Sequence, residues 1–321
     1  MNQTLKGKRV LVTGGAGFLG THLVPHLRDI GADVVVVRRR NHDLTRQEVV
    51  EALLTEVAPG VVVHLAAEVG GIGANRANPG RYFYANAIMG INLIEAARAV
   101  GVAKFVQVGT VCSYPKHTPV PFVETDLWTG YPEETNAPYG IAKKSLAVML
   151  DAYRRQYDLN GIFLLPANLY GPFDNFDLET SHVIPALIRK FVEARDEGAE
   201  TVEVWGTGVA SREFLHVEDA ARAITLATVG YDEPEPVNIG TGHEVTIREL
   251  VELIASATGF SGRVEWDGSK PDGQPRRMLD VRRASEAFGF QASIPLADGL
   301  AQTVKWWEEH SATLGKDTLP K

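Results

Sequence analysis

Cysteine is nearly absent from this sequence of 321 residues, because Cys112 is the only one. A single thiol cannot form a disulfide within the chain, and it cannot supply a metal cluster that needs several cysteine ligands. Long apolar runs are also lacking: Val34–Val37 and Val61–Ala67 are far shorter than the roughly 20 residues that cross a bilayer. The opening segment MNQTLKGKRVLVTGG predicts a strand rather than a signal peptide. We therefore expect a cytoplasmic protein without disulfides, membrane spans or a metal site.

Large blocks of basic residues are absent as well. The chain has 32 basic and 40 acidic residues, a net charge of −8, with no lysine- or arginine-rich block that would bind nucleic acid or an anionic membrane. Its hydrophobic (45%) and charged (22%) fractions are those of an ordinary globular protein, which excludes a disordered or coiled-coil chain. We expect small molecules as its partners, and neither nucleic acid nor a membrane.

Short β-branched runs alternate with longer amphipathic segments over the first two thirds of the chain, which is the pattern of βαβ units. It predicts an α/β fold with a doubly wound parallel sheet, the Rossmann arrangement, and a smaller C-terminal α/β lobe. Because domains average about 150 residues, we place a first domain at residues 1–170 and a mainly separate second lobe at 171–321, with some segments returning to the first domain. The predicted strands are Val10–Thr13, Val34–Arg38, Val61–Leu65, Phe105–Val108, Ile162–Pro166 and Thr201–Trp205. The predicted helices are Leu19–Ile30, Gln47–Val57, Tyr82–Val100, Pro138–Tyr157, Val183–Ala194, Val217–Val229, Ile247–Thr258 and Leu296–Glu309.

The first predicted strand runs into a glycine-rich turn, with Gly14, Gly17 and Gly20 at the GxxGxxG spacing before a helix. Glycine lets the backbone turn tightly and approach a pyrophosphate, whose charge is stabilised by the free amides and the positive end of the helix. Glycine triplets also occur in ordinary strand–helix turns. The position of this one between a strand and a helix favours a dinucleotide site.

The end of the second predicted strand bears on the choice of cofactor. NAD-specific sites usually have an acidic residue there, about 20 residues beyond the glycines, that binds the ribose hydroxyls. This chain has Arg38-Arg39-Arg40 instead. Guanidinium groups form charge-assisted, often bidentate hydrogen bonds with a phosphate, so the cluster favours NADPH over NADH. The alternative is a solvated basic loop without a role in binding.

Tyr139 and Lys143 form the pattern YxxxK in a predicted helix, and a spacing of four places both side chains on one face. A nearby ammonium is expected to lower the pKa of the phenol, so that the tyrosine can exchange a proton with a carbonyl or an alcohol. The spacing arises by chance in many helices. Here it follows the glycine-rich βα unit and a strand that ends at Gly109-Thr110, which makes it more specific.

Eight further segments resemble the GDP-L-fucose synthase family of the extended short-chain dehydrogenases/reductases. They occur in order along almost the whole chain. They are LAAEVGGIGAN (Leu65–Asn75), CSYP (Cys112–Pro115), TNAPYGIAKK (Thr135–Lys144), NLYGPFDNFDLETSHVIPALIRKF (Asn168–Phe191), VWGTGVASREFLHVEDAA (Val204–Ala221), NIGTG (Asn238–Gly242), TIREL (Thr246–Leu250) and SKPDGQPRRMLDV (Ser269–Val281).

The resemblance implies a reaction on GDP-4-keto-6-deoxy-D-mannose, which is epimerised at C3 and C5 and then reduced by NADPH at C4 to GDP-L-fucose. Protons beside a ketone are acidic because the carbanion delocalises as an enolate, so inversion needs a base on one face and an acid on the other. The resemblance gives these two roles to Cys112 and His182. Tyr139 would donate a proton to the C4 oxygen, to which Thr110 would also hydrogen-bond. Lys143 would orient the nicotinamide ribose and tune the tyrosine.

The resemblance also implies which residues bind the two ligands. The expected NADPH contacts are Gly14, Gly17, Phe18, Leu19, Gly20, Arg38, Arg39, Ala66, Lys143, Pro166, Asn168, Leu169 and His182. The expected GDP-sugar contacts are Lys190, Trp205, Arg212 and Asp272. Lysine and arginine counter the diphosphate, tryptophan offers a stacking face, and aspartate accepts hydrogen bonds from hydroxyl or amino groups.

One departure from the family concerns the substrate, because the usual Ser-Ser-Cys is Thr110-Val111-Cys112 in this chain. The added methyl group and the valine reshape the wall beside the sugar. Two other functions therefore stay open: a related GDP-sugar 3,5- or 4-epimerase without net reduction, and a dinucleotide-binding regulator without turnover. The intact proton-transfer residues argue against a regulator. Because the long helices Tyr82–Val100 and Pro138–Tyr157 could pair across a dimer, as in many relatives, we expect a homodimer.

Overall fold

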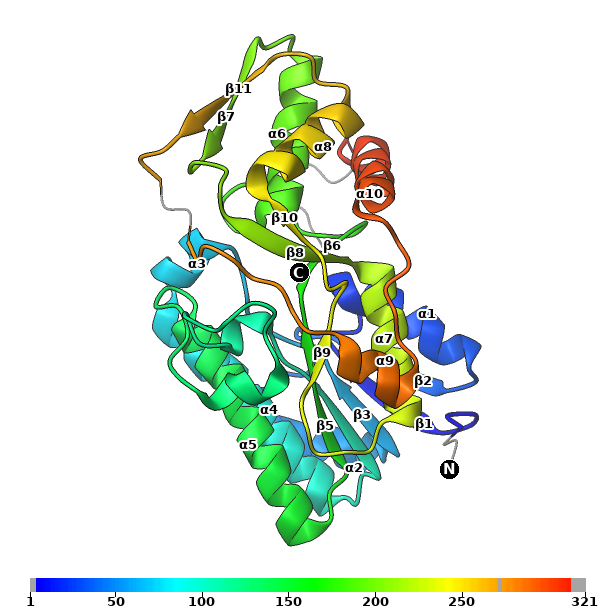
Figure 1. Cartoon of the computed structure of the whole chain (residues 1–321). Helices are drawn as coiled ribbons and strands as arrows, with labels where there is room; N and C mark the ends of the chain where they lie inside the picture. Colours follow the sequence, from blue (N-terminus) through cyan, green and yellow to red (C-terminus); the bar gives the residue numbers. More distant parts are fainter. Residues whose placement is uncertain (1–3, 271–272, 313–321) are drawn as a thin grey trace.

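The computed structural model describes residues 4–270 and 273–312, which form a lower and an upper lobe in the view of Figure 1. The lower lobe holds a six-stranded sheet in the order β2-β1-β3-β4-β5-β9, in which every neighbouring pair is parallel. The predicted doubly wound α/β fold is thus confirmed. The strands are β1 (Arg9–Thr13), β2 (Asp33–Val37), β3 (Val61–His64), β4 (Lys104–Val108), β5 (Gly161–Pro166) and β9 (Val237–Ile239).

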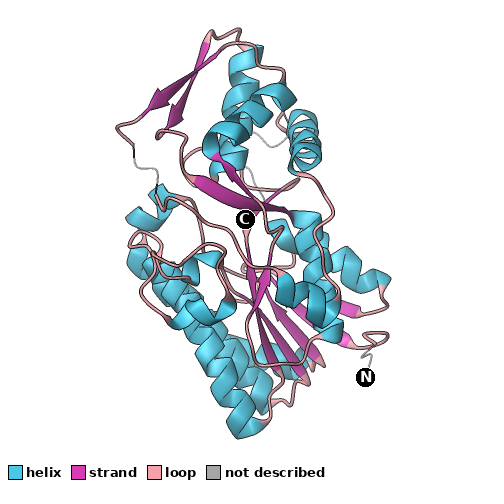
Figure 2. Ribbon diagram, viewed as in Figure 1, coloured by secondary structure: helices cyan, strands magenta, loops and turns pink. Residues whose placement is uncertain are grey.

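The central strands are mostly apolar because helices cover both faces of the sheet (Figure 2). Val10, Leu11 and Val12 of β1 are fully buried, and so are Val62 and Val63 of β3. Helices α2, α4 and α5 pack together on one face, while α1, α7 and α9 pack together on the other. These helices are α1 (Phe18–Asp29), α2 (Gln47–Val57), α4 (Pro79–Ala99), α5 (Ala137–Tyr157), α7 (Val217–Gly230) and α9 (Arg282–Phe288). Shorter helices are α3 (Ile72–Ala77), η1 (Val111–Ser113) and η2 (Glu124–Trp128).

The upper lobe has its own core and two small sheets, in the orders β10-β8-β6 and β11-β7. Aromatic side chains fill this core: the rings of Phe176 and Trp307 stack at 4.4 Å, and Phe191 meets Phe260 edge to face. The strands are β6 (Asn168–Tyr170), β7 (Thr201–Trp205), β8 (Ser211–His216), β10 (Glu244–Thr246) and β11 (Arg263–Asp267). The helices are α6 (Val183–Asp196), α8 (Ile247–Thr258) and α10 (Leu296–His310).

The chain passes between the lobes more than once. After β8 in the upper lobe it enters α7, which packs against α1 in the lower lobe. β9 then joins the sheet beside β5 through the pairs Leu164–Val237 and Pro166–Ile239. Both halves of the sequence therefore build the lower lobe, and the chain crosses to the upper lobe from the carboxyl ends of β5 and β9.

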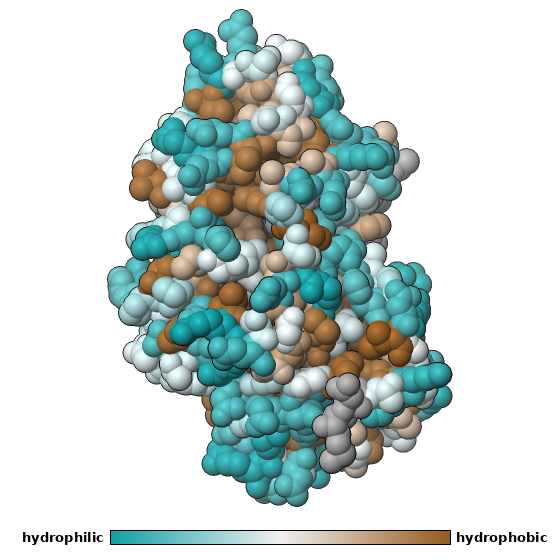
Figure 3. Space-filling model, turned by 45° about the vertical axis from the view of Figure 1, so that its right-hand side comes forward, coloured by the Kyte–Doolittle hydropathy of each residue, from teal (hydrophilic) through white to brown (hydrophobic). Residues whose placement is uncertain are grey.

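The surface is mostly hydrophilic, with apolar patches gathered toward the middle of the view in Figure 3. Exposed apolar side chains include Phe83 and Ile91 on α4 and Val148 on α5. Within the described residues, no helix is both long enough and apolar enough to span a membrane.

Candidate active site

The glycine-rich turn between β1 and α1 has the shape that a dinucleotide requires. Gly14 has a left-handed backbone (φ +72°), and a Cβ there would lie 2.7 Å from the Ala66 nitrogen. A Cβ on Gly20 would lie 2.3 Å from the Gly14 oxygen, so only glycine lets α1 start this close to the strand. Gly17 is the exposed N-cap of α1, and no side chain caps the first amides of the helix. These free amides fit a bound pyrophosphate.

The other predicted cofactor residues lie at the ends of neighbouring elements. Phe18 and Leu19 are the first residues of α1, and Ala66 follows β3. Farther along the sheet, Pro166 is the last residue of β5. Asn168 and Leu169 belong to β6. The side-chain amide of Asn168 donates to the backbone oxygen of Glu213 at 3.0 Å.

The arginines after β2 form an exposed turn, and one of them already has an ionic partner. Nη1 of Arg39 lies 2.6 Å from the Glu68 carboxylate, which also binds Arg81 at 2.6 Å. Among the described residues, no ion pair involves Arg38. Arg38 is therefore the more available of the two cations predicted to bind a phosphate.

The predicted catalytic residues after β4 lie against the start of α5. The Thr110 hydroxyl caps η1 by accepting a hydrogen bond from the Cys112 amide at 3.2 Å. Ser113 donates through Oγ to the Gly140 oxygen at 2.9 Å. A Cβ on Gly140 would lie 2.3 Å from the Cys112 oxygen, so this glycine lets η1 approach α5. Sequence reasoning missed Gly140, although it lies directly after Tyr139 in the YxxxK pattern.

Tyr139 is buried beside Thr110 and Cys112, and its pKa differs from the expected one. Burial and the negative charge that Cys112 can carry raise the pKa of Tyr139, which a hydrogen bond with Thr110 offsets only in part. The sequence prediction that Lys143 lowers this pKa is wrong for the protein alone. Although the two residues share one face of α5, burial of the phenol dominates its pKa, and Lys143 does not contribute to the shift.

Lys143 itself responds to burial. Its side chain is almost completely buried, and this burial lowers the pKa of Lys143 to about 8. Among the described residues, no carboxylate lies within ion-pair distance of its ammonium. Near neutral pH the Lys143 ammonium therefore loses its proton more readily than the ammonium of an exposed lysine does.

His182 comes from another element of the upper lobe, where it is the N-cap residue of α6. It reaches solvent, but the surrounding protein atoms lower its pKa by desolvation. The loop before it is held by Gly71, whose amide donates to the Thr180 oxygen at 3.0 Å. A Cβ on Gly71 would lie 2.5 Å from the Ser181 oxygen, which explains the glycine pair at positions 70–71. Within the described residues, no direct contact joins His182 to Cys112 or Tyr139.

Two of the predicted GDP-sugar residues lie together on the upper lobe. The ammonium of Lys190 lies 5.8 Å from the centre of the Trp205 ring, whose residue is 61% exposed at the end of β7. Lys270, which sequence reasoning missed, lies over the same ring at 5.4 Å. Arg212 lies on β8 and donates to the Ser211 oxygen at 2.7 Å. Asp272 lies outside the described residues.

Glu213 is a third residue that sequence reasoning missed. This buried carboxylate of β8 accepts hydrogen bonds from the amides of Thr241, Gly242 and Leu279, at 2.5, 2.9 and 2.6 Å. Burial nevertheless raises its pKa. Glu213 therefore ties three segments together where the two lobes meet, a role that no local sequence pattern indicates.

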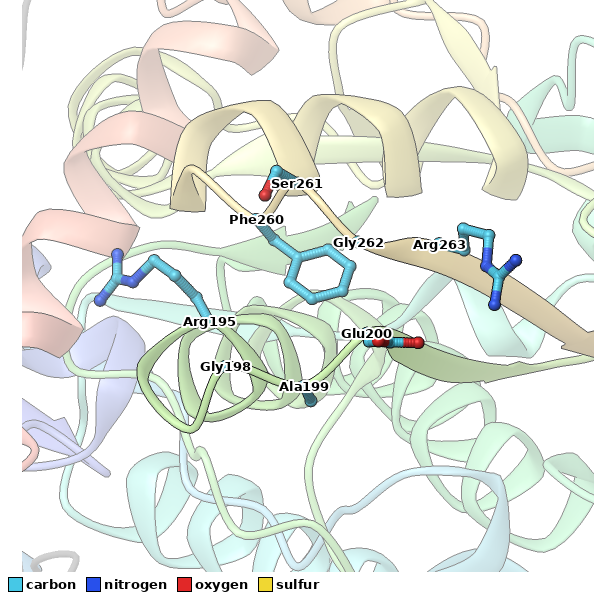
Figure 4. Close-up of a pocket in the computed structure, with 8 residues that line it drawn as sticks. All are labelled: Arg195, Gly198, Ala199, Glu200, Phe260, Ser261, Gly262 and Arg263. Atoms are coloured by element: carbon cyan, nitrogen blue, oxygen red, sulfur yellow. The ribbon is translucent and has the colours of Figure 1, made fainter.

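A hollow at the far end of the upper lobe does not belong to this site (Figure 4). Phe260 lies at its centre, between Arg195 at one end and Arg263 at the other. Arg195 is already paired with Glu308 at 2.6 Å and with Asp196 at 2.7 Å. The hollow therefore offers no free cluster of reactive groups.

The parallel sheet, the glycine turn and the tyrosine–lysine helix define a Rossmann-type enzyme that uses a nicotinamide dinucleotide. The chain belongs to the NAD dependent epimerase/dehydratase family, whose profile matches residues 10–240. It is 45% identical over 307 residues to "Probable GDP-L-fucose synthase 1" of Oryza sativa subsp. japonica, covering 95% of this chain and 93% of that protein.

Two further comparisons support the same relationship. The chain is 40% identical over 313 residues to the GDP-L-fucose synthase of Escherichia coli (strain K12), covering 94% of this chain and 97% of that protein. The crystal structure of a GDP-L-fucose synthetase from Naegleria fowleri bound to NADP has a TM-score of 0.89 and 27% identity, and the match covers 98% of each chain. The resemblance drawn from the sequence motifs is confirmed.

Proposed function

We propose that this chain is a bifunctional NADPH-dependent enzyme, a 3,5-epimerase and 4-reductase that converts GDP-4-keto-6-deoxy-D-mannose to GDP-L-fucose. The observation that carries the proposal is the packing of Thr110, Cys112 and Tyr139 against one another at the start of α5. It places a potential base and a potential acid side by side, and the reaction needs both close to one ketone. The relatives named GDP-L-fucose synthase support the choice of substrate.

The proposed epimerisation uses residues from two sides of the sugar. Cys112, as thiolate, removes the proton from C3 or C5, and the electron pair of the broken C–H bond delocalises onto the C4 oxygen as an enolate. His182 then delivers a proton to the opposite face of the same carbon. Because Cys112 lies on η1 and His182 at the start of α6, the two groups come from separate elements and can flank one substrate.

The proposed reduction uses the residues of α5. Bound NADPH supplies a hydride to C4. Tyr139 donates its proton to the C4 oxygen, and Thr110 holds that oxygen by a hydrogen bond. The raised pKa of Tyr139 keeps the phenol protonated before reaction, which is the form that a proton donor needs. Lys143, which follows on the same face of the helix, orients the nicotinamide ribose.

The remaining proposed contacts hold the two nucleotides. Arg38 and Arg39 bind the 2′-phosphate of NADPH. Lys190 and Trp205, together with Arg212 and Asp272, hold the GDP portion of the substrate. We also propose that residues 1–170 form the NADP-binding domain and that residues 171–321 form mainly the substrate-binding lobe, with α7, β9 and α9 returning to the first domain.

The deciding experiment incubates the protein with NADPH and GDP-4-keto-6-deoxy-D-mannose in deuterated water and follows NADPH absorbance and product NMR. We expect deuterium at C3 and C5, net oxidation of NADPH, and GDP-L-fucose. Tyr139→Phe should slow reduction by roughly 100-fold or more, the scale of general acid catalysis, while exchange continues. Cys112→Ser should lose exchange at both carbons.

The same experiment separates the alternatives. Inversion without net oxidation of NADPH would identify an epimerase and contradict the proposed reduction. Absence of both reactions would contradict the proposed enzyme. His182→Asn is a further control, because it leaves the base intact: exchange should continue at the carbons while inversion fails. Normal GDP-L-fucose formation by Cys112→Ser would remove the thiol from the mechanism.

We further propose a cytoplasmic homodimer, formed through the face of α4 and α5 that carries Phe83, Ile91 and Val148. These side chains are exposed on neighbouring long helices, where a partner would bury them. Light scattering coupled to size-exclusion chromatography should give twice the chain mass, and Ile91→Glu should shift it toward the monomer. A monomeric wild-type protein would contradict this proposal.

A further inference from the structure

Arg277 reaches the sulfur of Cys112 from a distant part of the chain. Its Nη1 donates to Sγ at 3.6 Å, within hydrogen-bond range for sulfur. Its Nε and Nη2 both donate to the Gln274 side-chain oxygen, at 3.2 and 2.9 Å. The Gln274 amide in turn donates to the Lys116 oxygen at 2.8 Å. The guanidinium is thus fixed in direction, with one nitrogen aimed at the thiol.

The backbone around Arg277 is fixed as well. The backbone oxygen of Arg277 accepts a hydrogen bond from the backbone amide of Glu213 at 3.1 Å. Two residues farther along the chain, the backbone amide of Leu279 donates to the side-chain carboxylate of Glu213 at 2.6 Å. The Phe122 amide donates to the Met278 oxygen at 2.8 Å. The segment therefore lies between β8 of the upper lobe and the loop that follows Cys112.

The charge of Arg277 is not balanced by a carboxylate. The residue is only 8% exposed, and arginine keeps its charge inside proteins. Within the described residues, its side chain donates only to a neutral amide oxygen and to Cys112, and no ion pair involves it. A buried cation without a counter-charge is costly. A thiolate on Cys112 would provide that charge, and it accepts a hydrogen bond far better than a thiol does.

We infer that Arg277 is a positioning residue that holds Cys112 as an oriented thiolate, the form in which it removes a proton from the sugar. The inference rests on the proposed function for the use of the thiolate, but the pairing itself is a property of the protein alone. Arg276, the adjacent arginine, is different: it is exposed and bound to Glu244.

The surroundings of Cys112 make its ionisation measurable. Arg277 from the segment after residue 273 and Tyr139 from α5 are the charged and titratable groups with which the described structure records an interaction of the sulfur. Tyr139 stays protonated at neutral pH because its pKa is raised, and Arg277 stays charged. Since the chain has one cysteine, every thiol alkylation event reports on Cys112.

The test measures the rate of iodoacetamide alkylation between pH 5.5 and 9.5, on the full chain without cofactor or sugar. Arg277→Gln should move the midpoint of the pH profile upward by about 1 to 2 units, the effect of removing a neighbouring cation, and slow alkylation near neutral pH by about tenfold or more. Arg277→Lys should restore much of the wild-type profile. The matched control, Arg276→Gln, should leave it unchanged.

A profile of Arg277→Gln that superimposes on the wild type overturns the inference. If circular dichroism shows that both variants are folded and Arg277→Lys still does not restore the alkylation profile, the role of the positive charge is overturned. If Arg277→Gln does not fold, the wild type is compared with its own chain unfolded in urea. A native midpoint below that of the unfolded chain supports the inference, and an equal or higher midpoint overturns it.

The sugar assay distinguishes this inference from the proposed function. A shifted alkylation profile without deuterium exchange by the wild type would contradict the function and leave the pairing intact. Deuterium exchange by the wild type, together with an alkylation profile that does not shift in Arg277→Gln, would contradict the inference alone. If both are right, the pH profile of exchange at C3 and C5 should move with the alkylation profile.

Discussion

The arginines after β2 differ in their availability, although the sequence presents them as one cluster. Arg39 shares the Glu68 carboxylate with Arg81, whereas no ion pair involves Arg38 among the described residues. Loss of a charge-assisted phosphate contact costs about 1.5 to 3 kcal/mol. Arg38→Ala combined with Arg39→Ala should therefore weaken NADPH binding by roughly tenfold to a hundredfold, with the larger part from Arg38. Fluorescence titration with NADPH gives the affinities.

NADH is the control for this prediction, because it lacks the 2′-phosphate. Its affinity should stay nearly unchanged in the same variants. An equal loss for both cofactors would show that the arginines support the fold of the turn rather than bind the phosphate.

At the scale of single residues, the sequence motifs predicted that Thr110, Cys112 and Tyr139 would lie close together, but not the pKa values of the site residues. Thr110, Cys112 and Tyr139 do lie together, as expected from their place after β4 and at the start of α5. The pKa of Tyr139 is raised rather than lowered, because it depends on burial, which a four-residue spacing does not encode. Arg277 was missed for a related reason: its contact with Cys112 joins residues 165 positions apart.

The contact between η1 and α5 depends on a residue without a side chain. A methyl group at Gly140 would meet the backbone oxygen of Cys112 at 2.3 Å, so η1 would have to move away from Tyr139. Gly140→Ala should lower the rates of both exchange and reduction by about 100-fold, the loss that a misplacement of about 1 Å can cause. Steady-state kinetics of both half-reactions would measure this effect.

Gly80→Ala is the matched control, because a methyl group at this glycine of α4 would meet no atom within 4 Å. We expect it to leave both rates unchanged. If Gly140→Ala kept wild-type rates, η1 would be free to shift without loss, and the close approach would not matter for catalysis.

At the scale of elements, the sequence predicted the long helices and the first five strands of the parallel sheet well. The helices Gln47–Val57 and Ile247–Thr258 and the strand Thr201–Trp205 have the bounds that their periodicity indicates. β6, β9 and β10 were missed, since three residues carry no measurable period. β8 and β11 are longer, but they mix polar and apolar residues and were missed as well. Their conformation depends on pairing with partners far away in the sequence.

Asp174 gives the stability of the whole molecule a pH dependence. This carboxyl group is buried between β6 and α6, and among the described residues its Oδ2 has no hydrogen-bond partner. Burial raises the pKa of Asp174 to about 7, from 3.8. The folded state therefore favours the protonated form. Its contribution to stability is full below about pH 4 and is lost as the pH rises through 7.

Asp174→Asn removes this titration while keeping the shape of the side chain. Relative to the wild type, the variant should gain stability between pH 4 and 8, by roughly 1.4 kcal/mol per pKa unit and a few kcal/mol in total. Urea unfolding at each pH measures the difference, and Asp29→Asn, at an exposed position, is the control. A difference that does not vary with pH would show that Asp174 is not the titrating group.

The return of β9 to the sheet affects how the molecule can be divided. A fragment ending at residue 170 would lack β9 beside β5, and it would also lack α7 and α9, which cover one face. It would expose an unpaired strand edge next to apolar side chains, a combination that leads to aggregation. The lobes are therefore not modules that could be exchanged between enzymes. A new sugar preference in this fold is accessible through substitutions along the shared boundary, and not through recombination of its halves.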